Sequence, residues 1–420
     1  MKKNKSKHLR RLKKLLAVLA VAIAGIVITV AAVNSVLYKL NMSYAQSFEQ
    51  VRYEAQLAPQ TDANGCAYFV SDDDFNIMQL TDIHIGGGFL SFKKDRMAMN
   101  AVAAMISEEK PDLVIITGDM TYATPQAASF NNKLGVKLLA SLMERLGVYW
   151  TVTFGNHDSE VYSYYSREKV SGFYTDPEYT HCLYEPGPEE VDGFGNHIIN
   201  VKNSDGLITQ SLIMLDSHAY TDDDPLGVRW LYENIHENQV DWYRANVEEL
   251  TAQNAARLSE LGLEATGESV SSLLFFHIPL VEYLDAYTEY SENSFKDTAD
   301  VKYIRGVIGE SGKFVYCGAG EDNLFESLDG TKAVFCGHDH LNNIQLEYKG
   351  VRLCYGMSSD YLAYIGISKK GDQRGCTMIA SYADSSIGVM PHSYYDDKYT
   401  PLYEKEEVTM ISGEGGNDNG

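Results

Sequence analysis

The sequence predicts an α/β domain preceded by one membrane-spanning helix. Three observations indicate this. Apolar runs typical of strands alternate with helical patterns from residue 75 onward, polar motifs follow several of these strands, and an uncharged apolar segment lies near the N-terminus. Hydrophobic residues make up 45% of the 420-residue chain and charged residues 22%, a composition that excludes a mostly disordered or fibrous protein. The length allows several domains or one large α/β domain with insertions.

The N-terminus combines a basic segment with a long apolar run. Residues 1–14 hold eight basic side chains and no acid, and residues 15–33 carry no charge. As a helix, such a run spans roughly the 30 Å hydrocarbon core, and the Lys and Arg before it predict an N-terminus inside the cell. We expect an uncleaved signal anchor over 15–33, with the main domain outside at the cell membrane. Secretion after cleavage near residues 30–32 is the alternative.

The charge of the remaining chain excludes nucleic acid as a partner. Beyond the basic segment the chain holds 27 basic and 58 acidic side chains, a net charge of −31. A surface this acidic repels phosphate backbones, so a DNA- or RNA-binding module is not expected.

The first half of the main domain, which we place at residues 73–400 after a polar stalk over 34–72, alternates strands with helices. Its apolar runs are short and rich in β-branched residues, and the segments between them carry apolar residues at helical spacing. Strands separated by helices of this length indicate βαβ units on a sheet covered on both faces. The expected elements are strands 75–81, 112–118 and 148–154, and helices 92–110 and 131–146.

The second half of the domain is less regular. Residues from about 159 to 230 and from about 283 to 330 are rich in polar residues, and we expect both to be insertions. Residues 401–420 are expected to form a disordered tail. The other expected elements are paired strands 197–201 and 207–215 inside the first insertion, helix 239–254, strands 273–276 and 332–336, and a hairpin over 345–355.

Five polar motifs each follow an apolar strand. Ligand sites in α/β sheets gather at the carboxyl ends of strands, so motifs that are distant in sequence can converge there. Together the five supply carboxylates, an amide oxygen and imidazoles, a donor set that suits a pair of divalent transition metals. Each motif alone is common in turns, and only the ordered set indicates a dinuclear site. The motifs are Asp82-Ile83-His84, Gly118-Asp119, Gly155-Asn156-His157-Asp158, His277, and Gly337-His338-Asp339-His340.

Over about residues 75–365 this ordered set resembles the calcineurin-like metallophosphoesterase superfamily. The segments FFHIPLVEY and GHDHLNN and residues 239–242 are similar to its purple acid phosphatase-like branch. The resemblance implies a four-layer αββα sandwich and two divalent metal ions (Mn, Zn or Fe) that activate water for in-line attack on a phosphomonoester. The alternatives are a phosphodiesterase acting on a cyclic nucleotide, a lipid headgroup or a wall polymer, and a non-catalytic surface binding protein.

The resemblance also implies a role for each motif residue. Each metal would have its own set of ligand side chains, and one carboxylate would bridge the two metals. A histidine that binds neither metal would protonate the leaving group. In this chain Asp82, His84 and His340 would hold the first metal, Asn156, His277 and His338 the second, and Asp119 would bridge them, while His157 would face the substrate and Asp158 would orient its imidazole.

Tyr122 marks a departure from the purple acid phosphatases. Those enzymes resemble this chain in the pattern G-D-x-x-Y, whose tyrosine binds ferric iron, and they usually have glycine where this chain has His84. We expect His84 to be the ligand and Tyr122 to lie beside it, which argues against a redox-active iron(III) form. His218, after strand 207–215, is a further candidate for the pocket wall, with an ordinary polar strand end as an equal alternative.

Overall fold

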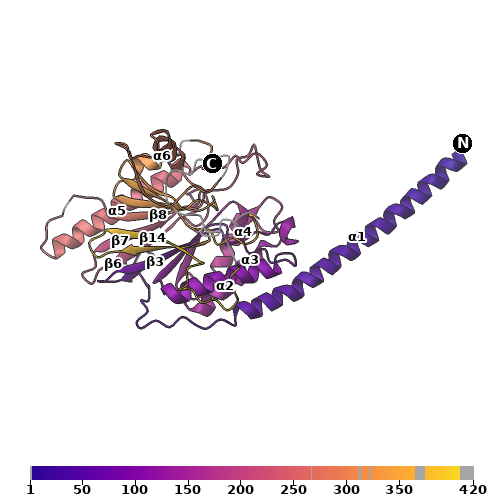
Figure 1. Ribbon diagram of the computed structural model, residues 1–420, viewed down its shortest axis with the longest axis horizontal. Helices are drawn as coiled ribbons and strands as arrows, with labels where there is room; N and C mark the ends of the chain where they lie inside the picture. Colours follow the sequence, from indigo (N-terminus) through magenta and orange to yellow (C-terminus); the bar gives the residue numbers. More distant parts are fainter. Residues whose placement is uncertain (1, 266, 311–313, 321–322, 365–373, 407–420) are drawn as a thin grey trace.

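Two β-sheets pack face to face at the centre of the molecule, with helices on both outer faces (Figure 1). The computed structural model describes residues 2–265, 267–310, 314–320, 323–364 and 374–406. Apolar side chains of both sheets meet in the layer between them, for example Ile77 and Ile115 from one sheet and Leu212 and Phe335 from the other. The four-layer αββα arrangement expected from the resemblance is confirmed.

The five-stranded sheet contains the predicted βαβ units. Its strand order is β14-β13-β3-β4-β5, and β3, β4 and β5 are parallel. Two helices cover its outer face, where Met99 and Leu139 share a core with Met78 and Val152. The elements are β3 (Phe75–Leu80), β4 (Leu113–Thr117), β5 (Trp150–Thr153), β13 (Gly375–Ser381), β14 (Ile387–Ser393), α2 (Phe92–Glu109) and α3 (Asn132–Leu146).

The nine-stranded sheet has the order β1-β2-β6-β7-β8-β10-β12-β11-β9 and is covered by α5 and α6. Its central strands β7, β8, β10 and β12 are parallel, and the hairpin β11–β12 matches the expected one. The elements are β1 (Gln60–Thr61), β2 (Ala67–Val70), β6 (His197–Lys202), β7 (Ile208–Met214), β8 (Ser272–Phe275), β9 (Val301–Arg305), β10 (Thr331–Cys336), β11 (Gln345–Tyr348), β12 (Val351–Tyr355), α5 (Glu237–Glu260) and α6 (Val281–Glu292).

The two expected insertions are smaller than the sequence suggested. The strands β6 and β7 are antiparallel as predicted, but they lie in the interior of the large sheet, so residues 197–214 belong to the core. The second region contains α6, whose Tyr283, Ala286 and Tyr290 are buried at helical spacing, and the edge strand β9. The first region also holds α4 (Arg167–Tyr174), and short turns of 3₁₀-helix lie at η1 (Pro125–Ala127), η2 (His157–Ser159) and η3 (Phe325–Ser327).

The helix α1 (Lys2–Ala45) runs without a break from the basic segment through the apolar run and into the domain. Within the described residues it is the one helix long and apolar enough to cross a membrane, and its apolar part projects from the body (Figure 1). The expected stalk over 34–72 does not match this structure. Asn41, Ala45, Phe48 and Val51 are buried in the domain, and β2 joins the large sheet. The residues of α1 that face the body recur every three or four positions, a helical pattern that the polar composition concealed.

Part of the expected tail is ordered. The Leu402 amide donates to Asn100 Oδ1, Tyr403 stacks on Tyr44, and Glu406 forms an ion pair with Arg374. Residues 401–406 therefore pack against the body, and residues 407–420 lie outside the described residues.

Candidate metal centre

The motif residues come together where strands of both sheets end. Four of them adopt left-handed backbone conformations: Asp82 (φ 52°), His84 (φ 55°), Asp119 (φ 50°) and His338 (φ 75°). Residues other than glycine rarely take such conformations, which cost roughly 1–3 kcal/mol each and concentrate at functional sites. Gly118 (φ 82°) turns the chain before Asp119, and a side chain there would meet the His277 ring.

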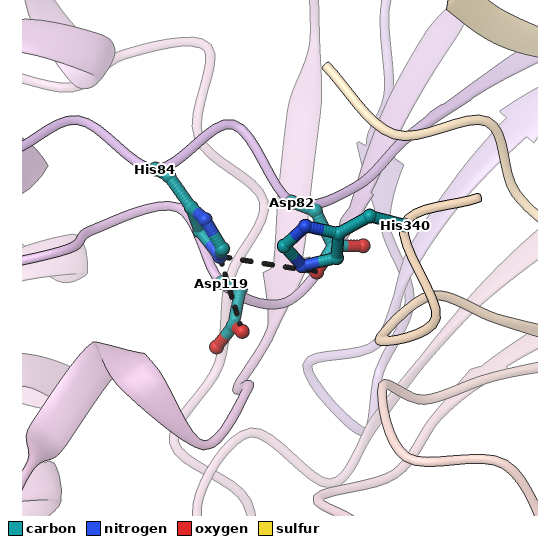
Figure 2. A group of neighbouring side chains, drawn as sticks. All are labelled: Asp82, His84, Asp119 and His340. Atoms are coloured by element: carbon teal, nitrogen blue, oxygen red, sulfur yellow. Dashed lines mark hydrogen bonds and ion pairs between the residues drawn. The ribbon is translucent and has the colours of Figure 1, made fainter. Parts of the chain in front are cut away.

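The first cluster consists of Asp82, His84, Asp119 and His340, whose side chains converge from three loops (Figure 2). His340 Nε2 lies 3.1 Å from Asp82 Oδ1, and His84 Nε2 lies 3.2 Å from Asp119 Oδ2. His84 Nε2 is also 3.9 Å from Asp82 Oδ1. The structure thus brings together the three residues expected to hold the first metal and the residue expected to bridge.

The second cluster shares Asp119 with the first. His277 Nε2 lies 3.2 Å from Asp119 Oδ2, 3.2 Å from Asn156 Oδ1 and 3.3 Å from His338 Nδ1. Asn156 donates its amide hydrogen to Tyr220 Oη at 2.8 Å, which leaves the amide oxygen directed toward His277. One carboxylate oxygen, Asp119 Oδ2, therefore faces an imidazole of each cluster at the same distance.

These residues fit a pair of divalent metal ions. Asp82 Oδ1 is buried and has no hydrogen bond, although it faces the ring nitrogens of His84 and His340. A buried carboxylate oxygen without a hydrogen bond is costly unless a cation lies beside it. Carboxylate, amide and imidazole donors of this kind accept Mn, Zn or Fe.

The charges of the clusters are strongly coupled. Burial opposes protonation of His84, but Asp360 and Asp119 outweigh it and raise its pKa to about 9. Burial likewise opposes protonation of His277, and Asp119 above all raises its pKa to about 9. Burial favours the neutral form of Asp119, yet His277 and His157 hold its pKa well below the usual range. Without a metal, His84 and His277 thus form imidazolium–carboxylate pairs, whereas burial and the neighbouring His277 hold the pKa of His338 well below its usual range. A bound cation would replace the protons of His84 and His277.

Asp360, which sequence reasoning missed, contacts a histidine on each side of the first cluster. Its Oδ1 lies 3.3 Å from His84 Nδ1 and its Oδ2 lies 3.3 Å from His340 Nδ1. Backbone amides of Leu362, Ala363 and Tyr364 donate to the same carboxylate, at 2.6–2.9 Å. A carboxylate on the outer nitrogen of a ligand imidazole fixes its tautomer and orientation. The sequence signal that could have identified Asp360 is its position shortly after β12, because it follows an apolar strand as the other motifs do.

Glu160, and not Asp158, holds the His157 ring. His157 Nδ1 lies 2.5 Å from Glu160 Oε1, because the short turn η2 places the residue three positions on beside His157. The expectation that Asp158 orients this imidazole is wrong. The buried Asp158 carboxylate instead accepts the backbone amides of Gly155 (2.9 Å), Asp119 (3.0 Å) and Thr121 (2.9 Å), and so joins the loops that follow β4 and β5.

Tyr122 lies against His84, as expected, with the ring centroids 5.0 Å apart and the planes at 24°. Burial raises the pKa of Tyr122 to about 12, so its phenol is neutral near pH 7. His218 makes its ring contacts away from the two clusters: Nε2 lies 2.8 Å from Gln239 Oε1, and the ring stacks on His236.

Further tyrosines that the sequence did not single out line the site. The Tyr232 ring lies 4.3 Å from the His338 ring, and the Tyr364 ring lies 5.9 Å from the His340 ring. Tyr220 and Tyr232 also stack on each other and pair as an isolated β-bridge. They join the base of the loop over residues 221–231, which belongs to the first expected insertion.

The chain is similar to several known proteins. Residues 75–342 match the family model for the calcineurin-like phosphoesterase. "Probable inactive purple acid phosphatase 28" of Arabidopsis thaliana is 26% identical over 325 residues, 70% of this chain and 73% of that protein. "Phosphatase DCR2" of Saccharomyces cerevisiae is 27% identical over 303 residues, 67% of this chain and 47% of that protein. A crystal structure of a dimetal phosphatase from Danio rerio covers 77% of this chain and 97% of its own at 10% identity, with a TM-score of 0.48.

Proposed function

Because the chain belongs to the calcineurin-like phosphoesterase family, we propose that it hydrolyses phosphomonoesters at a dinuclear metal centre outside the cytoplasm. The observation that carries this proposal is the position of Asp119 Oδ2, 3.2 Å from His84 Nε2 and 3.2 Å from His277 Nε2. A single oxygen between two sets of ligand atoms is the arrangement that a pair of bridged metals requires.

Each metal would have its own ligands. Two metals held in this way would polarise the phosphoryl group, lower the pKa of water and neutralise phosphate charge. Some relatives carry the word "inactive" in their names. The convergence of every ligand candidate in this chain supports activity. Asp82, His84 and His340 would bind the first metal, Asn156, His277 and His338 the second, and Asp119 both.

His157 is suited to protonate the leaving group. The His157 side chain is 24% exposed at the edge of the two clusters, whereas the neighbouring ligand candidates His84, Asp119 and Asn156 are buried. Glu160 occupies Nδ1, so Nε2 is the nitrogen left to donate a proton to the departing alkoxide. Its ring lies edge-on to both Tyr122 and His84, and these contacts restrict its orientation.

The test compares a monoester with a diester on the full chain in detergent. The protein is stripped of metal, reloaded with Mn, Zn or Fe, and assayed on p-nitrophenyl phosphate and bis-p-nitrophenyl phosphate. Metal-dependent release from the monoester is expected. A preference for the diester would make the protein a phosphodiesterase, and no release from either with two metals bound would favour a binding protein.

Two variants complete this test. His157→Ala should keep its metal and lose about a hundredfold in turnover, as for loss of a general acid. Asp119→Asn should lose metal, because an amide oxygen carries no charge to share between two cations. A fully loaded Asp119→Asn protein would contradict the bridging role.

For α1 we propose a signal anchor with its N-terminus in the cytoplasm. The apolar part of the helix is exposed on all sides, and the basic residues precede it. Resistance of the membrane-bound protein to carbonate extraction, together with digestion of the domain by protease added to intact cells, is the expected result. Release of a shortened soluble form would indicate cleavage instead.

A further inference from the structure

The helix α1 meets the body of the protein directly where its apolar run ends. Asn34 follows residues 15–33; its Nδ2 donates to the Ala128 carbonyl at 2.8 Å, and its Oδ1 accepts the Phe89 amide at 2.8 Å. Two turns later Asn41 is buried and accepts a hydrogen bond from Arg96 Nε at 2.9 Å. A helix rises about 1.5 Å per residue, so the loops at Phe89 and Ala128 lie level with the end of the apolar run.

Exposed apolar side chains gather in these loops and in the loop packed beside them. The Phe130 ring lies 5.9 Å from the Tyr162 ring, and the Phe130 carbonyl accepts the Tyr164 amide at 2.8 Å. Leu90 is 56% exposed and Tyr164 is 68% exposed. We call this set the near rim; its members are Phe89, Leu90, Phe130, Val161, Tyr162 and Tyr164.

A second apolar tip lies on the loop over residues 221–231. Its members, which we call the far rim, are Leu226, Val228 and Trp230, and Val228 is 73% exposed. Arg229, between two of them, is exposed as well. Tryptophan beside a cation and apolar side chains is typical of segments at a membrane surface.

The two rims flank the candidate metal centre. Val161 of the near rim directly follows Glu160, whose carboxylate contacts the His157 ring. Tyr220 and Tyr232 lie at the two ends of the loop that carries the far rim. Tyr220 contacts Asn156, and Tyr232 contacts His338. The loops around α4 lie on the side of the body toward which α1 projects, and α5 lies on the opposite side (Figure 1). Exposed apolar groups on both sides of a candidate site are unusual on a soluble surface and mark an interaction site.

We propose that both rims enter the lipid bilayer that holds α1, so that the metal centre opens onto the membrane and its substrate is the phosphate ester headgroup of a membrane lipid. This inference rests on the proposed function in two respects, the anchoring of α1 and the hydrolysis of a phosphate ester. The bilayer is the occupant that fits, because the near rim is continuous with the point where the apolar helix leaves the domain.

Tryptophan fluorescence tests the docking without any catalysis. The chain has three tryptophans and none lies in α1; Trp150 is fully buried, Trp242 lies in α5 and packs against the core beneath it, and Trp230 is 57% exposed in the far rim. The full chain is reconstituted in phosphatidylcholine vesicles with brominated acyl chains, and flotation verifies that it is anchored. We expect quenching that disappears in Trp230→Phe and persists in Trp242→Phe. Anchored protein without quenching, or quenching that Trp230→Phe leaves intact, would overturn the docking.

A rate comparison tests the substrate class. Phosphatidic acid or an isoprenoid phosphate in the same vesicle is compared with soluble p-nitrophenyl phosphate. In the triple variant Leu226→Ser, Val228→Ser, Trp230→Ser, the ratio of lipid to soluble rate should fall about fivefold or more, since the rim no longer enters the interface. The matched control is Leu263→Ser with Phe295→Ser, two apolar residues that are each 56% exposed outside the rims, and its ratio should not change.

The outcomes separate this inference from the proposed function. Turnover of the soluble ester with none of either lipid, or an equal ratio in both variants, would overturn the lipid assignment and leave the phosphatase proposal standing. No turnover of any ester, with quenching intact, would overturn the phosphatase proposal and leave the docking standing.

Discussion

At the scale of single residues, Asp360 links the two histidines of the first cluster through one carboxylate. Because both of its oxygens are engaged, by His84 and by His340, a change there affects two ligands at once. Three backbone amides also hold the carboxylate in place. The orientation of both imidazoles therefore depends on a residue that would touch neither metal.

We expect Asp360→Asn to weaken metal binding by about 10–100-fold, as is usual when the outer partner of a ligand histidine is lost. Titration of the metal-stripped protein with zinc measures this. Asp95→Asn is the matched control, since Asp95 is equally buried but its carboxylate contacts the Gly86–Gly87 turn, Ser91 and Asn41 instead of ligand histidines. Equal affinities in the two variants would remove Asp360 from the metal centre.

Glu160→Gln should retain its metals and lose about tenfold or more in turnover, because the His157 ring loses the charged partner that orients it. The kinetic constants distinguish this from a structural defect: the loss should lie in kcat and not in KM, while zinc content and melting temperature stay near those of the parent. Glu168→Gln, an exposed glutamate in the first turn of α4, is the control. An unchanged kcat would contradict the role of Glu160.

The ligand candidates were predictable from sequence because each follows a recognisable strand, and parallel strands end at one edge. Glu160 and Asp360 were not, because their contacts depend on loop conformation. The turn η2 rotates residue 160 beside His157, and the loop after β12 returns Asp360 to His84. The same turn carries Asp158 inward to three backbone amides, so the neighbour in sequence is not the neighbour in space.

At the scale of elements, Gly337 allows the chain after β10 to pass close to the chain after β3. A Cβ added there would lie 1.9 Å from Thr81 Oγ1 and 2.8 Å from Asp82 Oδ2. We expect Gly337→Ala to destabilise the fold by about 3 kcal/mol through overpacking, and to lower metal content with it. Denaturant unfolding checks the first effect and metal analysis the second.

The control for Gly337→Ala is Gly172→Ala in α4, where an added Cβ meets nothing within 4 Å. That variant should match the parent or be slightly more stable, since alanine favours a helix. Equal stability of the two variants would show that the ends of β10 and β3 separate readily.

Elements were predicted well where local periodicity was strong, as in α2, α3 and the strands between them. The strands β13 and β14 were missed because glycines and Pro391 interrupt their pattern; Pro391 is tolerated because β14 is the edge of its sheet. The positions of β6 and β7 depend on pairing with β2 and β8, which are distant in sequence. Such long-range pairing leaves no local signal.

At the scale of the whole molecule, metal and protons compete for the same site. The pKa values of His84 and His277 lie at about 9 in the metal-free protein, above the ordinary value of 6.5. Groups with raised pKa values stabilise the folded state fully below pH 6.5, and this contribution is lost as the pH rises through about 9. Metal binding displaces these protons and therefore strengthens over the same range.

Melting temperatures with and without a chelator should accordingly diverge as the pH rises. The metal-free protein is expected to lose stability between pH 6.5 and 9, whereas the metal-loaded protein is expected to change little. The experiment uses the full chain in detergent at pH 6, 7.5 and 9. A constant difference between the two forms would show that these histidines do not exchange protons for metal.

The continuity of α1 with the domain has a consequence for kinetics. If α1 spans the membrane as proposed, the domain has no flexible tether, because Asn34 and Asn41 hold it against the helix. It would then move only as the helix diffuses in the plane of the bilayer. If its substrate shares that plane, encounters depend on molecules per unit area. Diluting such vesicles at fixed composition would then leave the turnover of each enzyme unchanged.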